Sequence, residues 1–235
     1  MVEFSTLESK CSYLENKRSR MEYKYIENIP IDLNNALVKR GWRRFGNYYS
    51  RPQCSNCQEC LNLRVDAQNF NLSKSVRRTF IKCSNIKFAI QKPTISAEHL
   101  ELYDKYHKHM EQKKGWKHYS IKPQTYMELY VNGGGDFARE VLYFYGSTLI
   151  GVDLIDFIDD GISAIYFFYD PNFHKLSLGR LSIYQQILFA REQNLRWIYL
   201  GYYVKDCNSL NYKHQYKPHQ ILQGNPSLIE PAIWL

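Results

Sequence analysis

The pattern of apolar and polar residues predicts a protein that mixes helices and strands. Runs at residues 138–145, 148–158 and 163–169 are rich in β-branched and aromatic residues, and short turns that contain a glycine separate them. Such runs predict a meander of three strands. Apolar residues then recur at helical spacing over residues 181–191, and a short apolar run at 197–200 predicts a buried strand after that helix.

The first third of the chain predicts shorter elements. Asp32 is placed to cap a helix that ends at Gly41, and residues 43–50 predict a hairpin. Residues 61–65 alternate as a half-buried strand does, and residues 74–82 predict a short basic helix.

Two further helices are expected near the middle of the chain. Ser96 is an N-cap residue for a long helix that ends at Gly115, and a second helix spans residues 123–131. A proline before them indicates a boundary between an N-terminal module, residues 1–92, and a larger domain, residues 93–235. In that domain the order of helices, three strands, a helix and another strand resembles the GNAT acyltransferase fold, so we expect a mixed α/β (α+β) protein.

Composition bounds the class of protein. Of the 235 residues, 44% are hydrophobic and 15% are aromatic, which is typical of a chain that packs a globular core. No apolar run is long enough to span a bilayer, and residues 1–10 lack the pattern of a signal peptide. Six cysteines in a chain of this length fit a reducing compartment better than a disulfide scaffold. We therefore expect a cytoplasmic protein with no membrane partner.

The charge balance points to a polyanionic partner. The formal net charge is +8, and aromatic residues are interleaved with cations, as in the Trp-Arg-Arg-Phe run at residues 42–45. Cations bind phosphates and aromatic faces stack on unpaired bases, which suits RNA. The alternative is a basic protein that binds no nucleic acid.

Cysteines at strict three-residue spacing form the most unusual stretch of the chain. Cys54, Cys57 and Cys60 bring three thiols onto one short loop, and Cys11 would complete a set of four. That spacing suits zinc or an iron–sulfur cluster. The alternative is that the thiols pack as small apolar groups.

Two blocks of sequence together resemble one enzyme family. The first block has an Arg-Pro pair, the cysteine loop, a strand and then Ser-Lys-Ser-Val-Arg-Arg at residues 73–78. The second has Tyr-Asp-Pro at residues 169–171, Leu-Gly at 178–179, Tyr-Leu-Gly-Tyr-Tyr at 199–203 and Tyr-Lys at 212–213. In this order they resemble the aminoacyl-tRNA–protein transferases, the arginyl/leucyl-transferase family.

The resemblance implies a function. Bacterial members of about this size transfer leucine from leucyl-tRNA to proteins that begin with Asp or Glu, which marks those proteins for degradation in the N-degron pathway. Longer eukaryotic members transfer arginine. The expected partners are therefore an aminoacyl-tRNA and proteins with an acidic N-terminal residue. The reaction requires no cofactor, because the amino acid is already activated as an ester.

The resemblance and the charge pattern also nominate site residues. The expected catalytic residues are Asp170 and its neighbour Tyr169, since Pro171 biases Asp170 to an extended backbone that faces the acyl-transfer cleft. The alternative for Asp170 is a turn cap. Expected contacts to the protein substrate are Arg51, Arg64, Lys213 and Tyr202. Expected contacts to tRNA are Lys74, Arg77, Arg78 and Arg180. Asp153 and Asp156 are expected to be exposed.

Three alternatives remain open at this point. Arginine could be the donated amino acid. A non-catalytic, zinc-ribbon-like RNA-binding protein would also have the cysteines and the charge. An acetyl-CoA-dependent acetyltransferase is disfavoured, because the stretch before the helix at 181–191 contains one glycine, Gly179, where a pyrophosphate loop needs several.

Overall fold

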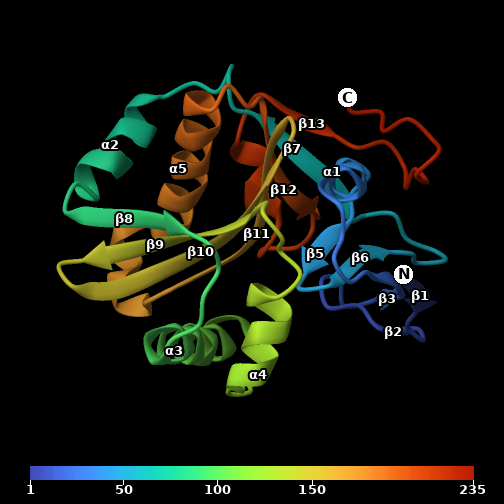
Figure 1. Ribbon diagram of the computed structural model, residues 1–235, viewed down its shortest axis with the longest axis horizontal. Coiled ribbons are helices and arrows are strands. Elements are labelled where there is room, and N and C mark those ends of the chain that lie inside the picture. Colours follow the sequence, from blue (N-terminus) through green and yellow to red (C-terminus); the bar gives the residue numbers. More distant parts are fainter.

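A computed structural model describes all 235 residues, and its largest element is a seven-stranded sheet (Figure 1). The strand order is β13–β7–β12–β11–β10–β9–β8, and every neighbouring pair is antiparallel except β11 and β12. The strands are β7 (Leu61–Asp66), β8 (Ile86–Gln91), β9 (Ala138–Tyr145), β10 (Thr148–Ile158), β11 (Gly161–Tyr169), β12 (Trp197–Tyr203) and β13 (His219–Ile221).

Helices cover both faces of this sheet (Figure 1). On one face lie α2 (Lys74–Lys82) and α5 (Leu178–Glu192), over a core of 21 buried residues. On the other lie α3 (Ala97–Lys114) and α4 (Pro123–Tyr126), which continues as a π-helical turn, Met127–Val131. The second face has its own core of 11 buried residues, so apolar burial holds helices to the sheet on both sides.

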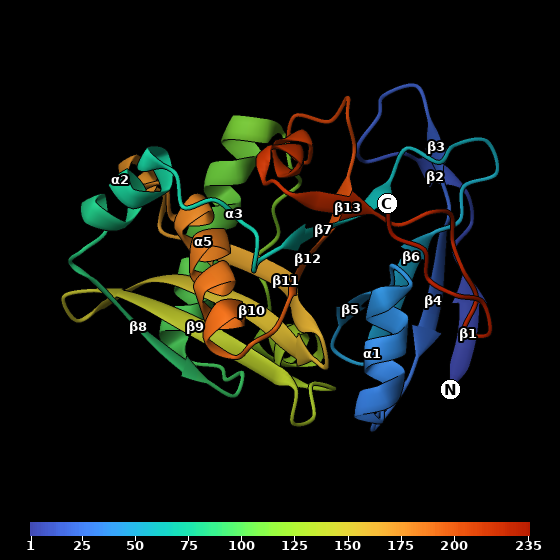
Figure 2. The ribbon, with the colours of Figure 1, turned by 90° about the horizontal axis from the view of Figure 1, so that it is seen from above.

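A smaller sheet lies beside the end of the large sheet that carries β7 and β13 (Figure 2). Its order is β1–β4–β6–β5, and α1 packs against it over a third core that includes Trp42 and Tyr49. Its elements are β1 (Val2–Ser5), β4 (Met21–Tyr25), α1 (Ile31–Lys39), β5 (Arg43–Phe45) and β6 (Tyr48–Pro52). A short hairpin, β2 (Ser9–Lys10) with β3 (Arg18–Ser19), stands beside it.

Local sequence signals explain several helix ends. The Ser96 hydroxyl accepts a hydrogen bond from the His99 amide at 3.3 Å, and Gly115 ends α3 in the left-handed region at φ 68°. Both predicted ends of that helix are confirmed. Asp32 is not a cap, because α1 begins at Ile31 and Asp32 lies in its first turn.

The large sheet takes strands from both sides of the boundary predicted at residue 92. β7 lies between β12 and β13, and β8 pairs with β9. The smaller sheet therefore ends at Pro52, and the seven-stranded sheet combines early and late parts of the chain. The mixed α/β prediction is confirmed, as is the order of three strands, α5 and β12. None of the helices is long and apolar enough to cross a membrane.

Candidate acyl-transfer site

The parallel pair at the centre of the large sheet separates along its length. β11 and β12 are paired only from Gly161 and Trp197 to Ser163 and Tyr199. Beyond that point β11 continues to Tyr169 and β12 continues to Tyr203 without pairing with each other. Main-chain groups of both strands are thereby released at their carboxyl ends, the side of an open α/β sheet where ligands bind. We call the region beyond the last pair the splay.

Arg43 enters the splay from β5 of the smaller sheet. Its Nη2 donates hydrogen bonds to the carbonyl oxygens of Ala164 and Ile165 on β11, the second at 3.1 Å. Gly201 on β12 makes room for it: φ there is +72°, and a Cβ atom would lie 2.7 Å from Arg43 Cζ. Any side chain at position 201 would take the place of the guanidinium. A narrow pocket begins here, lined by Arg43, Ser163, Tyr199 and Gly201 among others.

Lys213 reaches the other strand of the splay. It lies on a 3₁₀ helix, Asn211–Gln215, and its Nζ donates to the carbonyl oxygens of Leu200 and Tyr202 at 2.8 and 2.7 Å. The residue is 9% exposed. Burial, and after it the Arg43 cation, lowers the pKa of Lys213 to about 7.

Tyrosines surround the two cations. The hydroxyls of Tyr13, Tyr202 and Tyr212 all act electrostatically on Arg43, and burial raises the pKa of each. Tyr202, expected at the substrate site, is buried and donates a hydrogen bond to the carbonyl oxygen of Ser50 at 3.1 Å. Tyr13 and Tyr212 are 37% and 42% exposed as whole residues, so they lie on the solvent side of this group.

Asp170 caps a 3₁₀ helix and forms an ion pair. Its carboxylate caps the 3₁₀ helix Pro171–Leu176 by accepting from the Asn172 amide at 2.9 Å, as the turn-cap alternative requires. The same carboxylate pairs with Lys105 Nζ of α3 at 2.6 Å. Beside it, the Tyr169 ring packs 5.3 Å from the ring of Tyr106. Asp170 therefore stands at the end of β11 in a charged contact with α3.

Asp153 is fully buried beneath α5, which corrects the expectation that it is exposed. Its carboxylate accepts hydrogen bonds from the Ser182 hydroxyl at 2.6 Å and the Gln186 amide at 2.9 Å. Burial raises the pKa of Asp153 to about 7, although these two bonds oppose the shift. Asp156 is buried as well, and its partner is Arg44.

Two of the expected substrate contacts are already engaged within the protein. Arg51 Nε donates to the Glu22 carboxylate at 2.8 Å and its Nη1 to the Pro226 carbonyl at 2.9 Å, while the guanidinium lies over the Trp42 ring. Arg64 is stacked between the rings of Trp197 and Trp234 at 3.8 and 4.5 Å. The structure does not place either guanidinium with Lys213 in the splay.

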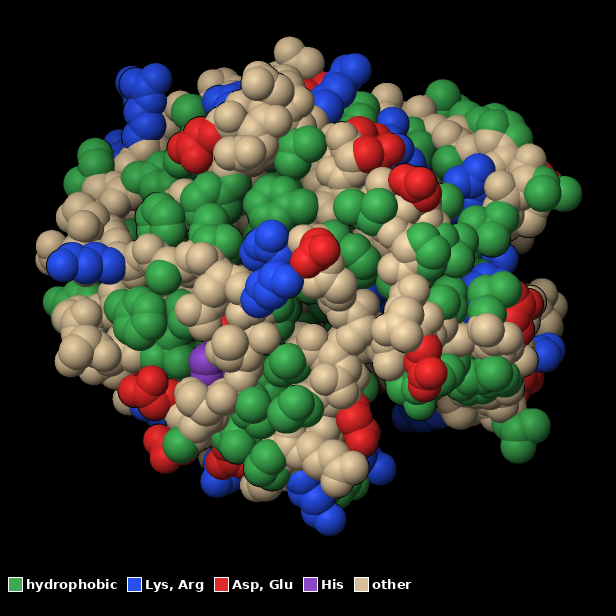
Figure 3. Space-filling view, in the orientation of Figure 1, with side chains coloured by type: hydrophobic (Ala, Val, Ile, Leu, Met, Phe, Trp, Pro, Cys, Tyr) green, Lys and Arg blue, Asp and Glu red, His purple; other side chains and the backbone are tan.

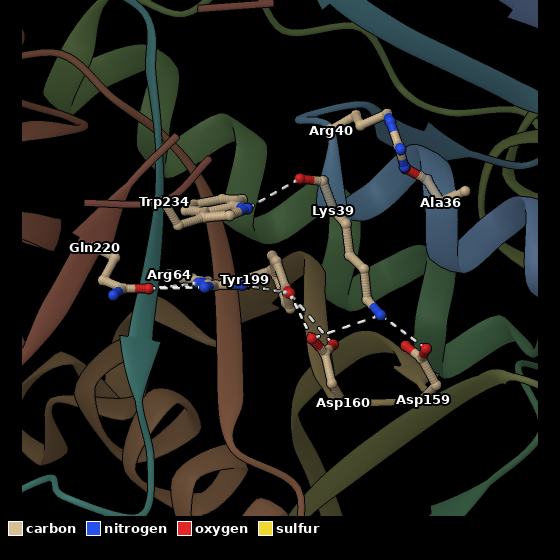
Figure 4. Close-up of polar contacts among 9 residues, drawn as sticks. All are labelled: Ala36, Lys39, Arg40, Arg64, Asp159, Asp160, Tyr199, Gln220 and Trp234. Atoms are coloured by element: carbon tan, nitrogen blue, oxygen red, sulfur yellow. Dashed lines mark hydrogen bonds and ion pairs between the residues drawn. The ribbon is translucent and has the colours of Figure 1, made fainter. Parts of the chain in front are cut away.

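Arg64 belongs to a network that holds the C-terminal tail (Figure 4). It donates to Gln220 and to the hydroxyl of Tyr199, and that hydroxyl reaches the Asp160 carboxylate. The chain of contacts continues through Lys39, which pairs with Asp159 at 2.7 Å and Asp160 at 3.6 Å. The Trp234 indole then donates to the Lys39 carbonyl at 3.1 Å, which fixes the tail against α1. The role of Arg64 here is structural.

Comparison with known proteins identifies the family. The description "Arginine-tRNA-protein transferase, C terminus" matches residues 98–223, and "Arginine-tRNA-protein transferase, N terminus" matches residues 9–78. The chain belongs to the arginine-tRNA-protein transferase family. Similar proteins named aspartate/glutamate leucyltransferase occur in Campylobacter jejuni serotype O:2 (52% identity over 99% of this chain and 97% of the relative), Helicobacter hepaticus (41%, 100% and 97%) and Hahella chejuensis (33%, 94% and 94%).

The residues expected to contact tRNA lie together on this transferase. Lys74, Arg77 and Arg78 are exposed on α2, and Arg180 is exposed on the first turn of α5. The two helices are in contact, and the Cys83 thiol, directly after α2, donates to the Leu176 carbonyl, just before α5, at 3.3 Å. None of these four cations forms an ion pair within the protein. Figure 3 shows basic side chains projecting at the end of the molecule that carries α2.

The thiols of the cysteine loop share a region but do not converge. Cys11, Cys54, Cys57 and Cys60 are all partly exposed free thiols. Burial, followed by the other three thiols, raises the pKa of Cys60 to about 12. No three Cys, His, Asp or Glu side chains stand in a metal-binding arrangement. The residues as placed therefore do not fit a metal or a cluster.

The transferase site contains residues that the sequence did not single out. In the sequence Arg43 belongs to a basic aromatic run. Strand alternation at 43–45 is the signal that places Arg43 and Arg44 on opposite faces. Asp153 was expected to be exposed because it alternates with apolar residues, but helices cover both faces of the large sheet and bury nearly all of β10.

Proposed function

We propose that this protein transfers leucine from leucyl-tRNA to the N-terminal α-amine of proteins that begin with Asp or Glu. The observation that carries the proposal is the 52% identity to an aspartate/glutamate leucyltransferase over 99% of this chain and 97% of that relative. Identity at this level along the whole length includes both sheets and the splay. Membership of the transferase family also argues against a non-catalytic, zinc-ribbon-like RNA-binding protein.

The reaction requires the protein to align the amine with the ester and to stabilise the charge that develops. The ester on the terminal adenosine of the tRNA is already activated, and the attacking amine has an unperturbed pKa of about 7.7–8.0, so part of it is neutral near pH 7. The protein has to hold amine and ester together, accept one proton and stabilise the developing oxyanion. The splay between β11 and β12 offers main-chain groups and cations for these tasks.

Asp170 is our candidate for the proton acceptor. It lies at the carboxyl end of β11, is 7% exposed and bears its charge against Lys105. A carboxylate held there is positioned to orient the incoming amine, and the neighbouring phenol of Tyr169 extends the polar surface.

The tRNA is proposed to lie across α2 and the start of α5. Lys74, Arg77, Arg78 and Arg180 present four cations there with no acidic partner in the protein. Phosphates supply the missing negative charge, and release of their counterions drives such binding. The cytoplasm, where charged tRNAs are available, is the proposed compartment.

The donor is decided by one experiment. Purified protein is incubated with a peptide that begins with Asp and with tRNA pools charged with radiolabelled leucine or arginine. We expect label on the peptide from leucyl-tRNA, and little or none from arginyl-tRNA. Label from arginyl-tRNA alone would reassign the donor. Tight RNA binding without transfer from either pool would contradict the function itself.

A further inference from the structure

Two cations meet in the splay without an acidic partner. Arg43 donates only to main-chain carbonyls of β11, and Lys213 only to main-chain carbonyls of β12. Neither residue takes part in an ion pair. Their electrostatic neighbours are phenols and the Cys207 thiol rather than carboxylates in contact. The Asp156 carboxylate does act electrostatically on Arg43, but Arg44 already binds this carboxylate with two hydrogen bonds of 2.6 Å.

Such an arrangement is costly unless an anion completes it. Charged groups removed from water are normally paired, and leaving a cation unmatched costs several times what a paired one does. The burial of both groups is visible in their lowered pKa values. Arg43 is partly exposed, and its Nε and Nη1 make no hydrogen bond within the protein, so each can still donate a hydrogen bond to a ligand.

We propose that Arg43 and Lys213 form the receptor for the side-chain carboxylate of the substrate's N-terminal Asp or Glu. This inference rests on the proposed function. It assigns to Arg43 the role expected of Arg51 and Arg64, which are committed to Glu22 and to the C-terminal tail. A carboxylate can accept a charge-assisted hydrogen bond from Nε or Nη1 of Arg43, and a lysine adds a point charge. A neutral amide, as in Asn or Gln, would leave both cations unmatched.

The position of Gly201 allows an independent geometric test. The guanidinium of Arg43 lies directly against this glycine, and a Cβ there would come within 2.7 Å of Cζ and 2.8 Å of Nε. Gly201→Ala keeps both charges but displaces the guanidinium of Arg43. The change should therefore weaken selection of the carboxylate, whereas a purely structural glycine would alter stability alone.

The test compares peptides that differ only in an N-terminal Asp or Asn. The readouts are kcat/KM for leucine transfer and, separately, peptide affinity by calorimetry with saturating uncharged leucine tRNA. We expect wild type to prefer Asp by about 100-fold, and Arg43→Gln to remove most of that preference by raising KM for the Asp peptide. Lys213→Met and Gly201→Ala should each reduce the preference about tenfold. All variants should bind tRNA as wild type does.

Arg191→Gln is the matched control. Arg191 is also an arginine that donates only to main-chain carbonyls, those of Ala67, Gln68 and Phe70, but it lies at the far end of α5. It should lose a comparable amount of stability and keep the Asp preference. Arg43→Lys retains the charge and should retain part of the preference. It serves as the test variant if Arg43→Gln folds poorly.

The outcomes separate the two proposals. Equal affinity of wild type for the Asp and Asn peptides, or an unchanged preference in Arg43→Gln and Arg43→Lys, would overturn the receptor. Preferential binding of the Asp peptide that depends on Arg43, without transfer from leucyl-tRNA, would uphold the receptor and contradict the proposed function.

Discussion

Arg43 and Arg44 are consecutive residues on β5, yet their surroundings are opposite. Arg44 is 3% exposed and holds the Asp156 carboxylate through two hydrogen bonds of 2.6 Å. Arg43 points to the other face of the strand, into the splay, and contacts carbonyl oxygens only. Strand alternation separates the two side chains: both connect β5 to the large sheet, but Arg44 binds a buried carboxylate and Arg43 faces the candidate site.

The difference shows that the partner of a charge, rather than the charge itself, separates structural from functional cations. Arg51 resembles Arg44, since the Glu22 carboxylate pairs with it, whereas Arg64 has no acidic partner but is held between two tryptophan rings. Lys213 and the basic residues of α2 resemble Arg43. An unsatisfied charge is retained only at a cost in stability, and that cost is expected where a ligand completes the site.

The largest expected effect is on the paired side of this comparison. Arg44→Ala leaves the Asp156 carboxylate buried without a cation, and the free energy of unfolding should fall by about 3–5 kcal/mol. Urea denaturation measures it. The double change Arg44→Met with Asp156→Leu should recover most of the loss, and a full loss in the double variant would show that the pair is not the cause.

Next in size is the role of Asp170. Asp170→Asn preserves the helix cap, because Asn also accepts from a turn amide, but removes the charge that could receive a proton. We expect the single-turnover transfer rate to fall about 100-fold with tRNA affinity unchanged. Full activity in this variant would leave Asp170 with its capping role alone.

Lys213 makes a prediction about pH and stability. Its folded pKa of about 7 lies below the unfolded value of about 10.4, so between these limits the unfolded chain holds a proton that the folded protein lacks. This residue therefore makes stability rise with pH across that window, by up to about 1.4 kcal/mol per pH unit. Lys213→Met should flatten the profile from pH 7 to 9 in urea unfolding. An unaltered slope would mean that burial does not lower the pKa of this lysine.

The exposed unpaired cations should act on tRNA alone. Replacing Arg77 and Arg78 by Ala is expected to weaken tRNA binding about tenfold and to lower the slope of log affinity against log salt by about 2. Stability should change little, because neither residue has a protein partner. Filter binding at several salt concentrations measures both quantities, and an unchanged slope would move the tRNA elsewhere on the surface.

The smallest expected effect concerns the cysteine loop. The spacing of Cys54, Cys57 and Cys60 predicts about one zinc or one cluster per chain, whereas the thiols as placed do not converge. Elemental analysis of protein purified without oxygen decides between them. In either case we expect the transfer rate to be the same before and after chelation, and a large loss of rate would give the metal a role that the chemistry does not require.

Local signals made the helices and the central meander predictable from the sequence. Ser96 and Gly115 bound α3 because capping depends on neighbouring residues. The sequence did not predict β8, because this edge strand depends on pairing with β9, some fifty residues further along the chain. The same limit applied to the site. Charge is visible in a sequence, but the Glu22 partner of Arg51 and the tryptophans around Arg64 are set by tertiary packing.

The position of β7 has a consequence for synthesis on the ribosome. β7 lies between β12 and β13, so its two neighbours are made more than 130 residues later. Until they emerge, β7 has two open edges, and such edges invite non-native pairing. The tail that carries Trp234 then closes over α1 as the final contact. A nascent chain that stalls before residue 197 thus lacks one strand of the splay.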